Sequence, residues 1–234
     1  MTKNQVKLED LIQITDASID WKRFSGKTIL ISGANGFLPA YMVETLLFLY
    51  LKGVVSDIKI LALVRNIQKA KSRFKDYLNY RNLEFIVQDV CDPIEIDQKI
   101  DFIIHAASQA SPRYYGTDPV GTLSANIFGT TNLLKLAKLN KVESFLYFSS
   151  SEVYGVLPEN KIPTIESDYG FIDPTNVQSS YAESKRMGET ICISWLHQYN
   201  IPIKIVRPFH TYGPGMQLND GRVYADFIAD IGHL

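Results

Sequence analysis

The feature that most constrains the fold is a short apolar run that leads directly into a glycine turn and then into a helix pattern. The run Thr28-Ile29-Leu30-Ile31 is typical of a strand buried on both faces. Gly33 and Gly36 follow in the turn, and an apolar helix pattern continues through Leu51. Gly33 permits a tight turn, Gly36 lets the backbone approach a ligand, and the helix N-terminus attracts negative charge. The segment therefore predicts a diphosphate-binding site, with an ordinary strand-to-helix turn as the alternative.

Apolar runs and helix patterns alternate along the rest of the chain. Further strands are predicted at residues 58–64, 83–87, 102–107, 144–149 and 201–206, and long helices at residues 118–139 and 181–199. Strands that alternate with helices predict an α/β fold with a Rossmann-like, doubly wound parallel sheet. Residues 1–25 precede this pattern and are interpreted as an N-terminal extension with one short amphipathic helix. The loop at residues 156–178 is long for a compact domain, which favours a functional role.

Composition and charge argue against several classes of protein. A net charge of −1 gives no reason to expect a nucleic-acid or anionic-membrane partner. Cys91 and Cys192 are too few and too far apart for a disulfide framework, and with four scattered histidines no metal site is predicted. No stretch has the length and apolar character of a signal peptide or a membrane span. These features predict a protein of the reducing, cytoplasmic compartment.

Tyr181 and Lys185 form the most informative chemical pair in the sequence. They lie four residues apart in a predicted helix, so both side chains project from one face. A lysine cation beside a phenol favours the phenolate, and lowering a tyrosine pKa from about 10 to about 7 takes roughly 4 kcal/mol. Such a tyrosine can take a proton from a sugar hydroxyl while a hydride leaves the same carbon. Two residues on a solvated helix face are the alternative for this spacing.

Several predicted strands end in residues suited to a dinucleotide, at the edge where open parallel sheets bind ligands. Arg65 follows the second strand, where an acidic residue would hold the adenosine ribose. An arginine there can accept a ribose 2′-phosphate instead, with a solvated arginine as the alternative. Asp89 follows the third strand, at the expected place of the adenine amino group. After the fourth strand, Ala106 and Ala107 are small enough for a nicotinamide to lie against the backbone.

With these pieces in place, the chain resembles the extended short-chain dehydrogenases/reductases, and among them the NAD-dependent epimerase/dehydratase family. The resemblance runs from about residue 27 to residue 230, with every motif in order. The matching motifs are Gly33-Ala34-Asn35-Gly36-Phe37-Leu38, His105-Ala106-Ala107, Asn126-Ile127-Phe128-Gly129-Thr130, Ser150-Ser151-Glu152-Val153-Tyr154-Gly155, Tyr181 with Lys185, and Arg207-Pro208-Phe209-His210-Thr211-Tyr212-Gly213-Pro214.

The resemblance implies an enzyme with bound NAD or NADP, a nucleoside-diphosphate sugar as substrate, and a homodimer formed through the helices near residues 118–139 and 179–199. It implies catalytic roles for Tyr181, Lys185, Ser150 and Glu152. The cofactor-binding positions that it implies are Gly33, Asn35, Gly36, Phe37, Leu38, Arg65, Asp89, Val90, Ala106, Ala107, Ser108, Tyr181, Lys185, Thr211 and Arg222. The implied substrate-binding positions are Ser150, Asn132, Lys138 and His210.

Within the family, the chain is most similar to the UDP-glucuronate decarboxylases, which make UDP-xylose. This similarity rests on residues 105–112, 151–155, 166–169 and 219–223. It implies a transient 4-keto sugar acid that loses carbon dioxide before hydride returns. Ser151 stands where dehydratases have an aspartic acid, and a serine is far less acidic, so 4,6-dehydration is disfavoured. Epimerisation at C4 needs fewer groups and stays open, with the presence of Glu152 weighing against it.

Some positions depart from the decarboxylase pattern. Ser124 and Leu139 replace basic residues of the substrate site, Trp195 replaces a tyrosine and His210 an asparagine. Family members also continue well beyond residue 234. The resemblance therefore divides the chain into an extension at 1–25, an NAD(P)-binding domain at 26–208, and the beginning of a truncated substrate-binding subdomain at 209–234. A truncated NAD(P)-binding module without catalytic activity is the alternative from another class.

Overall fold

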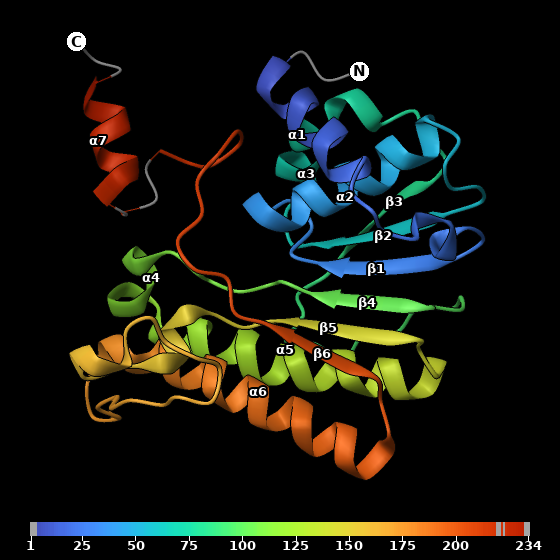
Figure 1. Ribbon diagram of the computed structural model, residues 1–234. Coiled ribbons are helices and arrows are strands. Elements are labelled where there is room, and N and C mark those ends of the chain that lie inside the picture. The colour runs from blue at the N-terminus through green and yellow to red at the C-terminus, as the bar shows by residue number, and fades with distance from the viewer. Residues whose placement is uncertain (1–3, 219–220, 222, 232–234) are drawn as a thin grey trace.

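The protein is built around one parallel sheet with helices on both faces (Figure 1). The computed structural model describes residues 4–218, 221 and 223–231. In these residues the six strands are β1 (Thr28–Ser32), β2 (Lys59–Val64), β3 (Leu83–Val87), β4 (Phe102–His105), β5 (Ser144–Phe148) and β6 (Ile203–Val206), in the order β3-β2-β1-β4-β5-β6. Every pairing is parallel. This order reverses direction at β1, so that the sheet has a switch point between β1 and β4, as predicted for a doubly wound fold.

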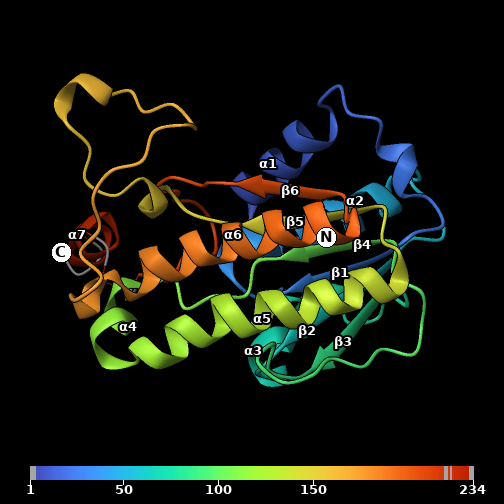
Figure 2. The same ribbon diagram turned by 90° about the horizontal axis from the view of Figure 1, so that it is seen from below.

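The strands alternate side chains between two separate cores. Leu30, Leu61 and Ile103 pack toward α5 (Pro119–Asn140) and α6 (Ser180–Tyr199) in one core. Ile29 and Ile60 belong to the opposite core, which is covered by α2 (Phe37–Leu51) and α3 (Ile67–Arg73), and α1 (Gln5–Thr15) packs on α2. Figure 2 shows α5 and α6 lying side by side across their face of the sheet. Because both faces of the central strands are covered, the strands read as continuous apolar runs.

β4 and β6 are each two residues shorter than the sequence predicts, and β2 and β5 are each one residue shorter. β4 ends at His105 because the backbone N–H groups of Ala106 and Ala107 donate to Ser32 Oγ, each at 3.2 Å, instead of extending the strand. β6 begins at Ile203 rather than at residue 201, because Pro202 has no N–H to donate to a neighbouring strand.

The N-terminal residues form the short helix that the sequence predicts. Asn4 caps α1 by accepting from Lys7 N, and Leu11 is fully buried. An ion pair between Lys7 and the buried Glu44 joins α1 to α2, and Tyr41 donates to Asp10 at 2.9 Å. η1 (Trp21–Phe24) follows, and the Phe24 ring packs edge-on against Phe102 of β4.

Most of the remaining elements lie at the carboxyl edge of the sheet. They are α4 (Pro112–Thr117), η3 (Ser151–Tyr154), η4 (Glu159–Lys161), η5 (Val177–Ser179) and α7 (Val223–Ile231). The short helix η2 (Lys75–Tyr77) follows α3 instead. The predicted loop at residues 156–178 closes on itself through an antiparallel bridge between Val156 and Phe171. Among the described residues, no helix has both the length and the apolar character needed to cross a bilayer.

Candidate active site

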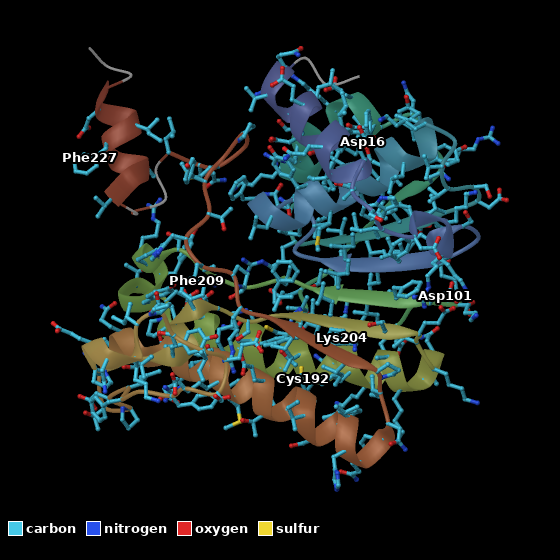
Figure 3. All side chains as sticks on the ribbon, in the orientation of Figure 1. Asp16, Asp101, Cys192, Lys204, Phe209 and Phe227 are labelled. Atoms are coloured by element: carbon cyan, nitrogen blue, oxygen red, sulfur yellow. The ribbon has the colours of Figure 1, made fainter. Side chains whose placement is uncertain are left out.

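A cleft of about 240 Å³ lies at the carboxyl edge of the sheet, where β1, β4, β5 and β6 end. Figure 3 shows Phe209, one of its lining residues, at this end of the molecule. Parallel α/β sheets bind ligands at this edge, next to the switch point in strand order. The lining residues are Gly36, Phe37, Leu38, Ala106, Ser108, Ala110, Pro112, Tyr115, Phe148, Ser149, Ser150, Ser151, Glu152, Tyr181, Lys185, Pro208, Phe209, His210 and Thr211.

The glycine turn between β1 and α2 forms one wall of the cleft. A Cβ at Gly33 would lie 2.7 Å from the Cα of Ala107, and φ at Gly33 is +65°, so a side chain is excluded for two reasons. Gly36 is the N-cap of α2 and has no side chain to bond the N–H groups of the first helical turn. Ser108 also lines the cleft, and its Oγ is buried without a hydrogen-bond partner among the described residues. A turn without side chains, a helix N-terminus and an unsatisfied hydroxyl suit a diphosphate-containing dinucleotide.

A directed chain of hydrogen bonds holds the ends of β1 and β4 beneath that wall. Ser32 Oγ accepts from two backbone N–H groups, so its own proton goes to Nδ1 of His105 at 2.8 Å. His105 Nε2 therefore holds the ring proton and donates to Thr130 Oγ1 at 3.1 Å, which donates to the carbonyl of Asn126. Burial and the nearby Lys185 charge lower the pKa of His105 to about 3. The imidazole is neutral and has a structural part in shaping the site.

Tyr181 and Lys185 lie in the first turns of α6 and point into the cleft rather than into solvent. Tyr181 is 6% exposed and Lys185 is 2% exposed, which excludes the solvated helix face considered for this pair. Lys185 Nζ donates to the carbonyl of Phe148 at 2.6 Å and lies 5.8 Å from the centre of the Tyr181 ring. It also lies 5.1 Å from the centre of the Tyr147 ring. The ammonium is thus placed among aromatic rings at the end of β5, close enough to favour a phenolate at Tyr181.

The buried Lys185 makes stability depend on pH. Burial lowers its pKa from 10.5 to about 7, with Cys192 and Glu189 acting in the opposite direction. Between these two values the unfolded chain binds more protons than the folded chain, so the free energy of unfolding rises with pH. We expect Lys185→Met to remove a slope of up to about 1.4 kcal/mol per pH unit. Urea unfolding of both proteins from pH 7 to pH 9.5 measures this difference, and parallel curves would contradict it.

η3 and its N-cap residue place two hydroxyls and a carboxylate in the cleft. Ser150 is the N-cap of this short helix and accepts from the backbone N–H of Glu152 at 3.2 Å. Ser151 N donates to the carbonyl of Pro208 at 3.0 Å, which ties η3 to the segment after β6. Ser150, Ser151 and Glu152 all line the cleft, so a ligand there meets two hydroxyls and one carboxylate from consecutive residues.

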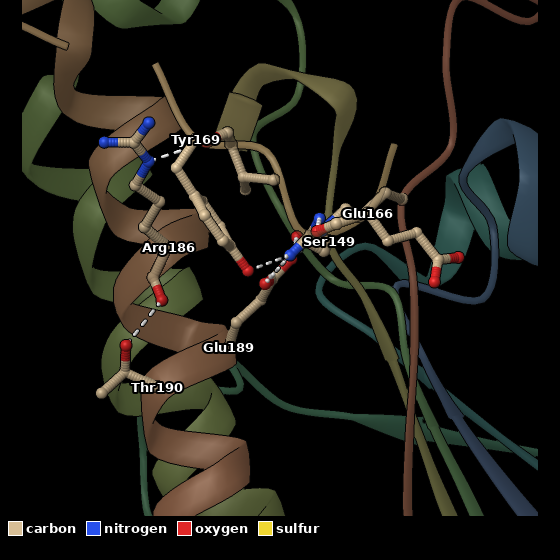
Figure 4. A network of polar contacts seen from close by, with 8 residues as sticks. Ser149, Glu166, Tyr169, Arg186, Glu189 and Thr190 are labelled. Carbon is tan, nitrogen blue, oxygen red and sulfur yellow. Dashed lines mark hydrogen bonds and ion pairs between the residues drawn. The ribbon is translucent and has the colours of Figure 1, made fainter. Parts of the chain in front are cut away.

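Arg207 and Glu189 join four segments near the cleft, namely the ends of β5 and β6, α6 and the long loop. Arg207 donates twice to the Glu189 carboxylate, at 2.9 and 2.7 Å, and both side chains are more than four-fifths buried. Glu189 also accepts from Ser149 Oγ at 2.5 Å. Arg207 reaches the long loop through the carbonyl of Glu166 at 2.8 Å and the hydroxyl of Tyr169 at 3.1 Å. Figure 4 shows Ser149, Glu189 and Tyr169 converging on this network, which fixes the ends of β5 and β6 relative to α6 and the loop.

The structure brings many of the predicted site residues to the cleft and leaves others outside it. The predicted residues that line the cleft are Gly36, Phe37, Leu38, Ala106, Ser108, Ser150, Glu152, Tyr181, Lys185, His210 and Thr211. Those that do not line it are Gly33, Asn35, Arg65, Asp89, Val90, Ala107, Asn132 and Lys138. Arg222 lies outside the described residues. Within the described residues, no group of three His, Cys, Asp or Glu side chains is arranged to hold a metal ion.

Arg65 and Asp89 lie together outside the cleft, so only a ligand that extends beyond the cleft could contact them. Arg65 Nη1 is 3.6 Å from Asp89 Oδ2, and the Arg65 side chain is 63% exposed. Burial alone would raise the pKa of Asp89, but hydrogen bonds from Cys91 and the charge of Arg65 lower it below its ordinary value. Asp89 is therefore ionised, and its partner Arg65 keeps donors available to solvent.

Asn132 and Lys138 lie on α5 outside the cleft, and their implied roles in substrate binding stay predictions. Asn132 Nδ2 lies 3.0 Å from each of the carbonyls of residues 90, 91 and 92, so the amide stabilises the turn after β3. Lys138 lies over the Tyr199 ring at 3.8 Å, near the C-terminal ends of α5 and α6. Lys138 is 20 residues beyond the cap of α5 at Asp118, about 30 Å along the helix.

Tyr115 and Glu189 were not predicted from the sequence. Tyr115 lines the cleft from α4, and no local pattern pointed to it because its partner is distant in sequence. Glu189 had a signal, since it lies four residues beyond Lys185 and therefore on the same face of the helix.

Comparisons with known proteins agree with this geometry. The model of the NAD dependent epimerase/dehydratase family matches residues 29–233. The chain is 37% identical over 205 residues to UDP-glucuronic acid decarboxylase 5 of Arabidopsis thaliana, covering 88% of this chain and 57% of that protein. It is 36% identical over 202 residues to UDP-glucuronic acid decarboxylase 1 of Xenopus tropicalis, covering 86% of this chain and 45% of that protein. The chain thus spans about half the length of these relatives.

Solved structures have the same fold. A UDP-glucuronic acid 4-epimerase from Bacillus cereus, in complex with UDP-glucuronic acid and NAD, superposes with a TM-score of 0.68 at 26% identity, over 87% of this chain and 63% of that one. A UDP-N-acetylglucosamine 4-epimerase from Methanobrevibacter ruminantium superposes with a TM-score of 0.74 at 24% identity, over 89% of this chain and 64% of that one.

Proposed function

The chain belongs to the NAD-dependent epimerase/dehydratase family, and from this premise we propose that it acts on a nucleoside-diphosphate sugar through a transient 4-keto intermediate, with decarboxylation of UDP-glucuronate as the reaction. The observation that supports the proposal most directly is the burial of Tyr181 and Lys185 in one cleft with Ser150 and Glu152. These groups are a base, a cation to tune it, a hydroxyl donor and a carboxylate. The decarboxylase relatives support the choice of substrate.

NAD or NADP fits the residues around the glycine turn. The first turn of α2 would hold the diphosphate, and the small residues after β4 would hold the nicotinamide ribose. The cofactor would also be a hydrogen-bond partner for the buried Ser108 hydroxyl. Asp89 and Arg65 would contact the adenosine half. When bound, the nicotinamide accepts a hydride from the sugar and later returns it.

The chain's own residues would handle the protons. Tyr181 removes the proton of the C4 hydroxyl as the C4–H electron pair leaves, so that C4 becomes a ketone. Lys185 stabilises the charge on the phenolate, and Ser150 hydrogen-bonds the sugar oxygen. The product is a β-keto acid, whose bond between C5 and the carboxylate breaks to release carbon dioxide and leave an enolate. C5 is then protonated, with Glu152 placed to act there or to orient the ring, and Tyr181 returns its proton to the C4 oxygen when C4 is reduced.

Three other functions are the alternatives to decarboxylation. A 4-epimerase would use the same tyrosine and lysine, and the epimerase structures above share the fold. A 4,6-dehydratase would need an acid where Ser151 stands. A chain that holds NAD(P) but does no chemistry would keep the glycine turn and would have no use for a buried lysine beside a tyrosine.

The reaction is tested by incubating the protein with NAD and UDP-glucuronate labelled at the carboxylate carbon. We expect labelled carbon dioxide and a UDP-pentose, in equal amounts, with no lasting absorbance of the reduced nicotinamide. The same assay is run with UDP-glucose and UDP-galactose. If the protein releases no carbon dioxide but interconverts UDP-glucose and UDP-galactose, it is an epimerase. If it binds NAD(P) and transforms none of these sugars, the binding module is correct.

Arg65 predicts that NADP is accepted. Its exposed guanidinium stands where an acidic residue would otherwise repel a 2′-phosphate. We expect the dissociation constant for NADP to be within about tenfold of that for NAD, and Arg65→Asp to weaken NADP binding by at least about tenfold, one charge contact of roughly 1.4 kcal/mol. Calorimetric titrations measure both constants. Arg81→Asp is the control, because it makes the same charge change just before β3, at the amino end of the strands rather than the carboxyl end. A strong NAD preference in the unchanged protein would contradict the role of Arg65.

We also propose a homodimer in the cytoplasm. Apolar residues exposed on α5 and α6, among them Phe128, Ile193 and Leu196, support self-association through these two helices. Free Cys91 and Cys192 suit a reducing compartment. Sedimentation velocity measures the oligomeric state, and a monomer at micromolar concentration would contradict the homodimer.

A further inference from the structure

The Tyr115 ring lies flat against the Tyr181 ring. Their centroids are 4.9 Å apart and the ring planes differ by 10°. Tyr115 is also held from its far end, because its hydroxyl donates to the carbonyl of Ala110 at 3.0 Å. Both rings line the cleft. One face of the Tyr181 phenol is therefore covered by a ring that is itself fixed.

The position of α4 makes this stacking a built feature. Pro112 begins the helix, and the helix packs against α5 and against η5, which leads directly into α6. A Cβ at Gly116 would lie 3.2 Å from Gln178 Nε2, so α4 approaches η5 closely. The element that holds Tyr115 is thus packed on the turn that places Tyr181.

A stacked ring acts on a phenol in two ways. It excludes water from one face, and its own face has negative potential, so both effects favour the neutral phenol over the phenolate. Lys185 from α6 acts in the opposite sense. Among the described residues, Tyr147 from β5 interacts electrostatically with Tyr181, and Glu152 from η3 and His210 from the segment after β6 line the same cleft.

We propose that Tyr115 is a positioning residue for Tyr181. The Tyr115 ring fixes the orientation of the phenol and keeps one of its faces dry, so that Tyr181 exchanges its proton with the reacting hydroxyl rather than with water. The proposal rests on the proposed role of Tyr181 as the base. Lys185 and Tyr115 then form opposing contacts that set the ionisation of Tyr181 between them.

The ionisation of Tyr181 is measured directly by NMR on protein labelled at the Cζ carbons of tyrosine, with Tyr181→Phe to assign the signal. In Tyr115→Ala, we expect Tyr181 to titrate at a pH lower by about half a unit or more, because water and the loss of the stacked ring both favour the phenolate. Tyr115→Leu fills the space without a π face and is expected to shift the titration in the same direction by less. Tyr114→Ala, on the same helix with a side chain 41% exposed, is the matched control and should leave the titration unchanged.

Turnover is measured on the same variants. We expect Tyr115→Ala to lower kcat by about fivefold to tenfold, to change KM less, and to move the acidic limb of the kcat profile in step with the titration. The proposal is overturned if Tyr181 titrates alike in Tyr115→Ala, Tyr115→Leu and Tyr114→Ala, or if it titrates at a higher pH when the Tyr115 ring is removed. It is equally overturned if kcat falls while the acidic limb stays in place. Because the titration needs neither substrate nor cofactor, a shift with no turnover of UDP-glucuronate would contradict the proposed reaction alone.

Discussion

Tyr181→Phe is expected to lower kcat for UDP-glucuronate by about 10² to 10⁴-fold, the range for removing a positioned acid–base group. The substitution takes away one hydroxyl and leaves the ring stacked on Tyr115, with Lys185 still bonded to the carbonyl of Phe148. KM is expected to change much less, because the lost interaction is strongest in the transition state. Steady-state release of carbon dioxide measures kcat, and calorimetry measures NAD affinity.

The control for this experiment is Tyr114→Phe, which removes an equivalent hydroxyl from a neighbouring, more exposed position. It should retain full turnover, and both variants should keep the thermal midpoint of the parent. If Tyr181→Phe keeps more than about a tenth of the parent kcat, Tyr181 is not the base, and the proton of the C4 hydroxyl must pass to another group in the cleft.

Arg207→Met is expected to lower the free energy of unfolding by about 3 kcal/mol, near the lower end of the range for breaking a buried ion pair. The variant leaves the Glu189 carboxylate, 12% exposed, without its two charged hydrogen bonds. It also removes both bonds to the long loop, at Glu166 and Tyr169. Urea unfolding measures the loss, and faster proteolysis within residues 156–178 should accompany it, because that loop loses its attachment to β6.

Two variants make the second prediction specific. The double change Arg207→Met with Glu189→Leu removes both charges, and it is expected to cost less than the sum of the two single changes because no buried charge is left unpaired. Glu143→Gln breaks the exposed ion pair with Lys27 and is expected to cost less than about 1 kcal/mol. Equal losses in Arg207→Met and Glu143→Gln would show that the network contributes no more than a surface pair.

The candidate site was predictable where one short segment is enough to define it. Gly33 and Gly36 follow an apolar strand and begin an apolar helix, and this local order needs no distant partner to be read. The spacing of Tyr181 and Lys185 likewise places both on one face of a helix. The positions of Asn132 and Lys138 were not predictable in this way, because α5 extends far from the cleft. The contacts of each residue on α5 depend on which distant segment packs against that turn of the helix.

By itself, the sequence determined the elements of this protein and the chemistry available at each strand end. Apolar runs and helix periods are local patterns, so the six strands and the α/β class follow from them. The tertiary structure alone decided what those residues experience. The pKa of Lys185 falls to about 7 because β5 and α6 bury it, and His105 is neutral because β1 and α5 enclose it. Tyr115 meets Tyr181, and Arg207 meets Glu189, across separations in sequence that no local pattern can span. Burial and pairing depend on which distant segments pack together, and that packing exists only in the folded chain.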